Sequence, residues 1–277
     1  MGEMSDAVLQ KRLPEAPWMD AARWRLPGTV PIDPSLWLMQ DDAFAGQMAE
    51  RDRLIRDWRD AIVTCLDAAS DAAQECLDLV LDTLRGTRGY KVEESVVQRP
   101  DGIVIPVDRT QPMETTGRLI QEDICILQDN DQGEHVLTGA CLCFPASWTL
   151  SEKIGRPLTR IHAPVAEYSE DVSRRVQRLF NAIRPEVALM RANALLYARP
   201  DLHQPRLEGD TNLVETAPHE RPYLRSERQV LRRLPDTGAV VFSIHTFVVP
   251  LSALTTEQRD SLGPVLERYA ARSEHPE

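Results

Sequence analysis

The alternation of hydrophobic and polar residues divides the chain into a helical first part and a mixed remainder. Apolar residues recur at helical spacing in 42–59 and again in 61–84, which predicts two amphipathic helices. The second helix has a weak point near Ser70, where small and acidic residues interrupt the apolar stripe. A shorter helix is predicted over 113–120. The first part of the body is therefore expected to be helical scaffold.

The later part of the chain changes to the two-residue alternation typical of strands. Residues 121–128 and 135–144 flank the polar turn DNDQGE, which predicts a hairpin. Residues 239–250, AVVFSIHTFVVP, are β-branched and aromatic without a charge, and they predict the strongest strand. The segment 224–235 is rich in arginine and predicts a basic helix or turn. An amphipathic helix is predicted over 169–183.

These elements predict an α+β fold, because strands joined by short turns favour an antiparallel sheet with flanking helices and an N-terminal helical segment. Residues 1–40 carry proline and tryptophan at close intervals. They predict an extended arm that wraps the body of the domain or meets a partner. The predicted division is an arm over 1–40, a domain over 41–255, and a C-terminal helix and tail over 256–277.

Composition excludes several classes of function. The 277 residues carry a net charge of -11, whereas nucleic-acid binding needs a basic face. No apolar run is long enough to span a bilayer, and the first residues lack the apolar core of a signal peptide, so a cytoplasmic protein without membrane contact is expected. A reducing compartment is expected because no CxxC pair occurs among the five cysteines, Cys65, Cys76, Cys125, Cys141 and Cys143.

The motifs of common catalytic sites are missing from the sequence, and two histidines become the main candidates. There is no glycine-rich phosphate loop and no G-x-S-x-G. His162 comes near the end of the stretch CLCFPASWTLSEKIGRPLTRIHAPV (141–165), with Pro164 just behind it, and His245 lies within the apolar strand. Spacing alone leaves two alternatives open for each ring, a hydrogen-bonded core histidine or a ligand.

Seven segments stand out in order along the chain. They are WL (37–38), QEDICILQ (121–128), CFPASW (143–148), EKIGRPLTRIHAPV (152–165), RAN (191–193), RSERQVLRRLP (225–235) and VVFSIHTFVVPL (240–251). Together they resemble the haem-dependent oxidative N-demethylase family. The resemblance implies a PAS-like α+β fold that binds haem b through its iron. It also implies oxidative demethylation of a secondary amine such as dimethylamine, with O2 and with NADPH electrons from a separate flavin/iron–sulfur reductase.

The resemblance suggests His162 as the proximal ligand of the iron, because this residue lies in one of the matching segments. His245 is the rival residue for contact with the cofactor. Glu227 is the candidate catalytic carboxylate: it would relay a proton to bound O2 or, alternatively, orient a neighbouring arginine.

A haem also needs cations for its propionates. Arg191, Arg225 and Arg228 are candidates, because a guanidinium matches a carboxylate with two parallel hydrogen bonds. Ordinary ion pairing is the alternative for each of them.

Three positions depart from the family pattern, namely Ala166, Ala194 and Phe247, and they leave the identity of the amine open. A PAS-like haem or small-molecule sensor without turnover is the alternative function, since a fold does not determine an activity. The sequence also leaves open whether the protein is an oligomer.

Overall fold

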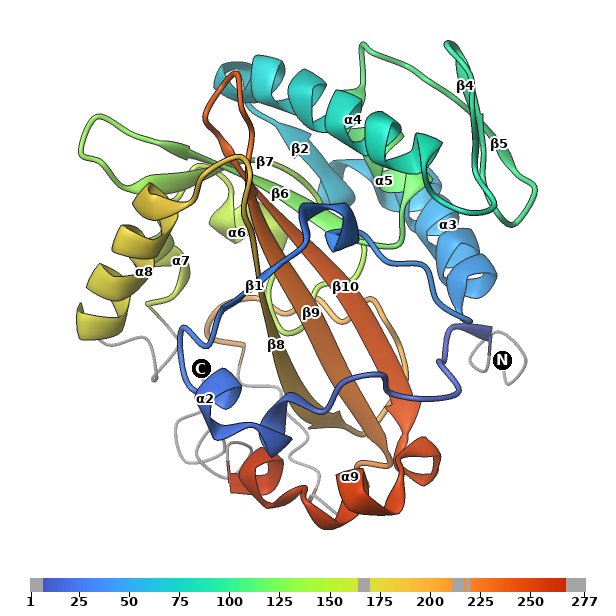
Figure 1. Ribbon diagram of the computed structural model, residues 1–277, viewed down its shortest axis with the longest axis vertical. Coiled ribbons are helices and arrows are strands. Elements are labelled where there is room, and N and C mark those ends of the chain that lie inside the picture. Colours follow the sequence, from blue (N-terminus) through green and yellow to red (C-terminus); the bar gives the residue numbers. More distant parts are fainter. Residues whose placement is uncertain (1–6, 164–169, 211–216, 218–219, 268–277) are drawn as a thin grey trace.

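The computed structural model describes residues 7–163, 170–210, 217 and 220–267, and its centre is one antiparallel sheet (Figure 1). The strand order in the described part is β1-β8-β9-β10-β6-β7-β2. The three long strands β8, β9 and β10 form the middle of the sheet. The bounds are β1 (Val30–Ile32), β2 (Val63–Cys65), β6 (Asp123–Asp129), β7 (His135–Cys141), β8 (Ala188–Tyr197), β9 (Tyr223–Arg233) and β10 (Val240–Pro250).

Helices and short 3-10 turns surround this sheet, and a small second sheet lies beside the first two long helices (Figure 1). Within the described residues, no helix is both long and apolar enough to cross a membrane. The helices are α2 (Ala21–Trp24), α3 (Phe44–Ile62), α4 (Ser70–Arg85), α5 (Pro112–Leu119), α6 (Leu150–Lys153), α7 (Leu158–Ile161), α8 (Glu170–Ala182) and α9 (Thr256–Asp260). The 3-10 turns are η1 (Pro17–Met19), η2 (Pro34–Leu36), η3 (Asp67–Ala69) and η5 (Leu251–Ala253), and the small sheet is β3 (Lys91–Val92), β4 (Val96–Gln98) and β5 (Val104–Pro106).

The two faces of the large sheet are covered differently. We call the first the arm face: it packs against α3, α4 and α5 and is crossed by the N-terminal arm, residues 7–43, which runs in front of β8, β9 and β10 in Figure 1. Its buried residues include Met190, Val230 and Val241. Burial of such side chains stabilises the fold by about 1.5–3 kcal/mol each.

We call the second face the open face. At the end of the sheet near the β6–β7 turn it packs against α6, α7 and α8 through apolar clusters that include Leu158, Phe180 and Leu231. Farther along β8 the side chains on this face are only half-buried, and they alternate with buried ones on the arm face. The described residues therefore leave part of this face uncovered.

A glutamine of the arm closes the free edge of β10. β6 pairs with residues 240–244 of β10, so in the described part of the chain the later residues of β10 have no neighbouring strand on that side. Gln10 is buried there, and its backbone N–H donates to the Val248 carbonyl at 3.1 Å. Its side-chain Oε1 accepts from the Val248 N–H at 2.8 Å, and Nε2 donates to the Thr246 carbonyl at 3.1 Å. One side chain thus replaces part of a strand.

The observed elements confirm the predicted mixture of helices and an antiparallel sheet. The helices expected over 42–59, 113–120 and 169–183 correspond to α3, α5 and α8, and the expected hairpin is β6–β7. The strand expected over 239–250 is β10. The C-terminal helix begins as expected, as α9, but residues after 267 lie outside the described part.

Two predictions of secondary structure were wrong. Residues 61–69 do not begin the second long helix: α3 continues to Ile62, β2 and η3 follow, and α4 begins at the weak point, Ser70. Residues 224–235 are not a basic helix or turn but most of β9, a central strand paired along both edges. Backbone pairing with β8 and β10 outweighs the local preference of the arginines, because tertiary context decides strand formation.

Candidate functional site

The register of the central strands separates the predicted site residues onto the two faces of the sheet. Asn193 of β8 lies opposite Glu227 of β9, and the next position, Arg228, lies opposite His245 of β10. Side chains alternate between faces along a strand. Arg228 and His245 therefore belong to the arm face, whereas Glu227 and Arg225 belong to the open face together with Arg191 and Asn193 of β8.

His245 is fully buried on the arm face and is held by two carboxylates. Its Nδ1 lies 3.0 Å from Glu122 Oε1, and its Nε2 lies 3.0 Å from Asp41 Oδ2. Burial opposes the charge on this ring, but the hydrogen bonds and negative charges of Asp41 and Glu122 outweigh that effect and raise the pKa of His245 to about 9. The ring is an imidazolium at neutral pH, with a proton on each nitrogen.

This arrangement assigns His245 a structural position. A protonated nitrogen has no lone pair for a metal, and both nitrogens already donate to oxygen. We therefore leave His245 out of the proposed cofactor site, although the sequence made it a rival candidate. Asp41 belongs to the arm and Glu122 directly precedes β6, so the bonds of His245 to these two carboxylates hold the arm against β6 and β10.

Arg228 also connects the arm to the sheet. Its Nη2 donates to the Leu36 carbonyl at 2.7 Å, and its Nη1 lies 3.4 Å from the Trp37 carbonyl. The side chain is buried, and this burial lowers the pKa of the Arg228 guanidinium from its usual value. With its fork directed at the arm, Arg228 is not placed to pair with a group on the open face.

Glu227 is held on the open face by three side-chain donors. Asn193 Nδ2 donates to Glu227 Oε2 at 3.1 Å, and Gln229 Nε2 donates to the same oxygen at 3.0 Å. Arg225 Nε reaches Glu227 Oε1 at 3.3 Å. The carboxylate therefore has a defined orientation. Asn193 also accepts from the Glu227 backbone N–H at 3.1 Å, which ties β8 to β9 at this point.

Arg225 has a structural set of partners in addition to Glu227. Its Nη1 donates to the Leu202 carbonyl at 2.8 Å, and its Nη2 donates to the Phe144 carbonyl at 2.5 Å. These bonds hold the segments around residues 144 and 202 against the sheet. Arg225 is buried, and its guanidinium nitrogens donate to oxygens of the protein.

His162 follows the last turn of α7 as its C-terminal cap. Its Nδ1 lies 2.9 Å from the Leu158 carbonyl. Because a carbonyl only accepts, Nδ1 carries the proton and Nε2 carries the lone pair of the ring. Burial lowers the pKa of His162, and the nearby positive charges of Lys153 and Arg191 lower it further, so the ring is neutral at pH 7. Pro164, which closely follows His162 in the sequence, lies outside the described residues.

Arg191 lies on the open face of β8 among half-buried side chains. Its Nη1 donates to Gln229 Oε1 at 2.8 Å. The half-buried residues on this face of β8 include Arg191, Asn193, Leu195 and Tyr197. The structure thus brings Arg191 near His162 and onto the same face as Glu227.

Asn193 and Gln229 were not among the predicted site residues. Each stands two positions from a predicted one, Arg191 or Glu227, and therefore on the same face of its strand. A basic helix or turn was expected over 224–235, and in a helix residues two apart do not share a face. For this reason Gln229 was not associated with Glu227.

The fold and this face together define a class of protein. It is an α+β protein whose antiparallel sheet presents an arginine and an oriented carboxylate on one face, with a neutral histidine beside them. The family model described as haem-dependent oxidative N-demethylase, alpha subunit-like, matches residues 28–272. The chain belongs to this family. The match supports haem dependence and oxidative demethylation at the level of the family.

Proposed function

We propose that this protein carries haem b on the open face and catalyses oxidative N-demethylation of a secondary amine. The observation that carries the proposal is the hydrogen bond from His162 Nδ1 to the Leu158 carbonyl. Ligands of this type commonly donate their other ring N–H to a carbonyl or carboxylate, which sets the tautomer and the ring orientation. A metal ligand must also be deprotonated, and the lowered pKa of His162 meets this condition.

The other residues of the open face fit a haem as well. A haem needs an apolar surface and a cation for its propionates. Leu195 and Tyr197 supply half-buried apolar surface on β8, and Arg191 supplies a guanidinium on the same face. Of the three arginines considered for the propionates, we propose Arg191, because it lies half-buried on the open face and its charge acts on His162. Arg225 is buried, and Arg228 lies on the arm face.

We also propose that β6 to β10 form the PAS-like core implied by the resemblance. The spatial order of these five strands is β7-β6-β10-β9-β8, so the first strand in the chain, β6, lies beside the last, β10, which is the middle strand. All four contacts between neighbours are antiparallel. The open face of this five-stranded part is the surface on which we place the cofactor.

When bound, haem would supply the activation of O2, with electrons from NADPH through a separate flavin/iron–sulfur reductase. The chain would supply the imidazole of His162 to hold the iron, a water-poor surface and a positioned carboxylate. Because three donors orient Glu227, its oxygens can hold a proton, or the cation of a protonated amine, at a fixed place. Loss of the methyl group would release formaldehyde.

The test is formaldehyde release from dimethylamine by haem-loaded protein with NADPH and a reductase. Glu227→Gln should lower kcat on the order of a hundredfold, as loss of a proton-transferring group does. Asp131→Asn, in the exposed turn after β6, is the matched control and should keep full activity. Haem binding without turnover of any secondary amine would contradict the enzymatic proposal and favour a sensor.

A further inference from the structure

Among the described residues, the outer edge of β2 has no neighbouring strand. β2 is the last strand of the sheet, and the strand that pairs with it in this part of the chain is β7. Thr64 lies opposite Ala140 in this pairing, and the Leu66 N–H donates to the Thr138 carbonyl at 2.9 Å. Since alternate residues of an edge strand direct their backbone groups outward, Val63 and Cys65 face the outer edge. The Val63 N–H donates to the Arg59 carbonyl, so Cys65 is the residue of β2 that would pair with an added strand.

The opposite edge of the sheet is protected in a way that β2 is not. There the outermost strand, β1, contains Pro31, which has no N–H to donate. β2, with the sequence VTC, has no proline and no charged residue. The two edges therefore differ in their capacity to accept an added strand.

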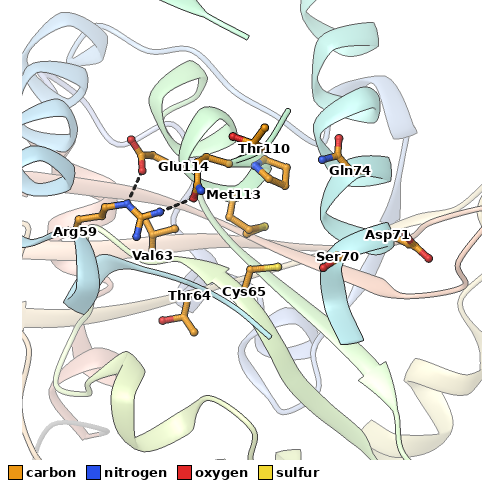
Figure 2. A pocket seen from close by; sticks show the side chains of 12 residues that line it. Arg59, Val63, Thr64, Cys65, Ser70, Asp71, Gln74, Thr110, Met113 and Glu114 are labelled. Atoms are coloured by element: carbon orange, nitrogen blue, oxygen red, sulfur yellow. Dashed lines mark hydrogen bonds and ion pairs between the residues drawn. The ribbon is translucent and has the colours of Figure 1, made fainter. Parts of the chain in front are cut away.

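A pocket of about 480 Å³ lies beside this open edge (Figure 2). It is lined by all three residues of β2, by the N-terminal parts of α4 and α5, and by Arg59 at the end of α3. Val63, Pro112 and Met113 give it an apolar part, and Gln74 and Gln111 contribute amides. Its volume falls in the range of about 300–1,000 Å³ that is usual for ligand sites. A groove of mixed polar and apolar lining beside a strand edge suits an extended peptide.

The charges around the groove favour a basic peptide. Arg59, the one cationic side chain among the described residues that line the pocket, is paired with Glu114 at 2.7 Å. Asp67 and Asp71 follow β2 and are exposed, and no lysine or arginine of the described chain forms an ion pair with either. The charge left for a ligand is therefore negative.

We propose that this groove binds an extended segment of a partner polypeptide that carries lysine or arginine, and that this segment adds to β2 as a further strand. Main-chain bonds to Cys65 would supply the affinity, and Asp67 and Asp71 would select basic side chains. The groove lies at the β2 end of the sheet, several strands away from β8. The proposal is therefore independent of haem binding.

The test measures fluorescence anisotropy of labelled peptides with the full-length protein. The probes are Ac-KVTVTVK-NH2, the same peptide with glutamate in place of lysine, and the lysine peptide with N-methyl groups on alternate amides. We expect the lysine peptide to bind at least tenfold more tightly than the glutamate peptide, and N-methylation to abolish binding. Absence of binding at about 1 mM, or equal binding of all three peptides, would overturn the proposal.

Two further measurements locate the site. The double variant Asp67→Lys/Asp71→Lys, at exposed positions, should lose at least tenfold in affinity for the lysine peptide. Asp131→Lys/Glu257→Lys, with the same change in net charge, should not. The lysine peptide should also slow hydrogen exchange of the Cys65 amide. Protection at another strand edge would contradict the proposal. So would a dimer of the protein alone, seen in sedimentation, in which the Cys65 amide is protected from exchange without any peptide.

Discussion

The central sheet has one histidine of interest associated with each face, and the two rings are held in opposite ways. On the arm face, His245 donates to Asp41 and Glu122 at 3.0 Å each and is fully buried. At the open face, His162 Nδ1 donates to the Leu158 carbonyl at 2.9 Å, and the ring is neutral. One ring is a cation that joins buried carboxylates, and the other has the protonation state of a metal ligand.

Arg228, which lies opposite His245, and Arg191, which lies near His162, differ in the same way. Arg228 directs its guanidinium at the carbonyls of the arm, whereas Arg191 lies half-buried on the open face beside Gln229. Arginines on neighbouring strands thus point to opposite faces of the sheet, one toward the arm and one toward the proposed site. Each prediction below separates these roles.

The largest effect is expected from removal of His245. His245→Ala leaves Asp41 and Glu122 buried without their cation, and loss of one partner of a buried ion pair costs about 3–5 kcal/mol. Denaturant unfolding should show this decrease in the free energy of unfolding. His162→Ala is the matched comparison at the other face and should cost less, because it removes a neutral ring and leaves no carboxylate without its cation. Equal losses in the two variants would contradict the division of roles.

The pH dependence of stability should have opposite signs for the two histidines. The folded pKa of His245, about 9, lies above the unfolded value of about 6.5. Its contribution is therefore complete below about pH 6.5 and is lost as the pH rises through 9, a total of about 3 kcal/mol. The pKa of His162 is lowered, so its effect appears as stability lost when the pH falls below about 6.5.

Unfolding free energies between pH 5 and 10 check this prediction. The difference in unfolding free energy between the wild type and His245→Gln should shrink between pH 6.5 and 9. The buried cysteines also make stability depend on pH, but they contribute equally to both proteins and cancel in this difference. His162→Gln should alter only the acidic side. A difference for His245→Gln that is independent of pH would show that the ring is not charged in the fold.

A smaller effect is expected at the edge of β10. Gln10→Ala leaves the Val248 N–H without its side-chain acceptor, and an unsatisfied buried group costs about 1–3 kcal/mol. The free energy of unfolding measures the loss. Lys11→Ala, at the exposed neighbouring position, should be nearly neutral. No loss for Gln10→Ala would mean that water replaces the glutamine at this edge.

The sequence predicted elements well where one local pattern dominated. The uncharged β-branched run 239–250 and the amphipathic run 169–183 appear as β10 and α8. It failed at 224–235, because the arginines there satisfy their guanidinium groups with distant carbonyls, such as those of Leu36 and Phe144. Those partners are far away in the sequence and leave no periodic signal.

The same limit applies to the site. Both histidines could be selected from the sequence, but the faces on which they lie depend on the register of β8, β9 and β10. Asp41 and Glu122 come from other parts of the chain, so the charge on His245 could not be foreseen from its apolar neighbours. The tautomer of His162 follows from the short turn of α7, which the sequence did not resolve as a helix.

The most direct measurement is the absorbance spectrum of the haem-reconstituted protein and of two variants. The wild type should show a Soret band typical of histidine-ligated haem. His162→Ala should lose the band or shift it, and His245→Gln, which keeps a hydrogen-bonding side chain, should leave its position unchanged. An unchanged spectrum in His162→Ala, or a shifted one in His245→Gln, would contradict the assignment of His162 as the axial ligand.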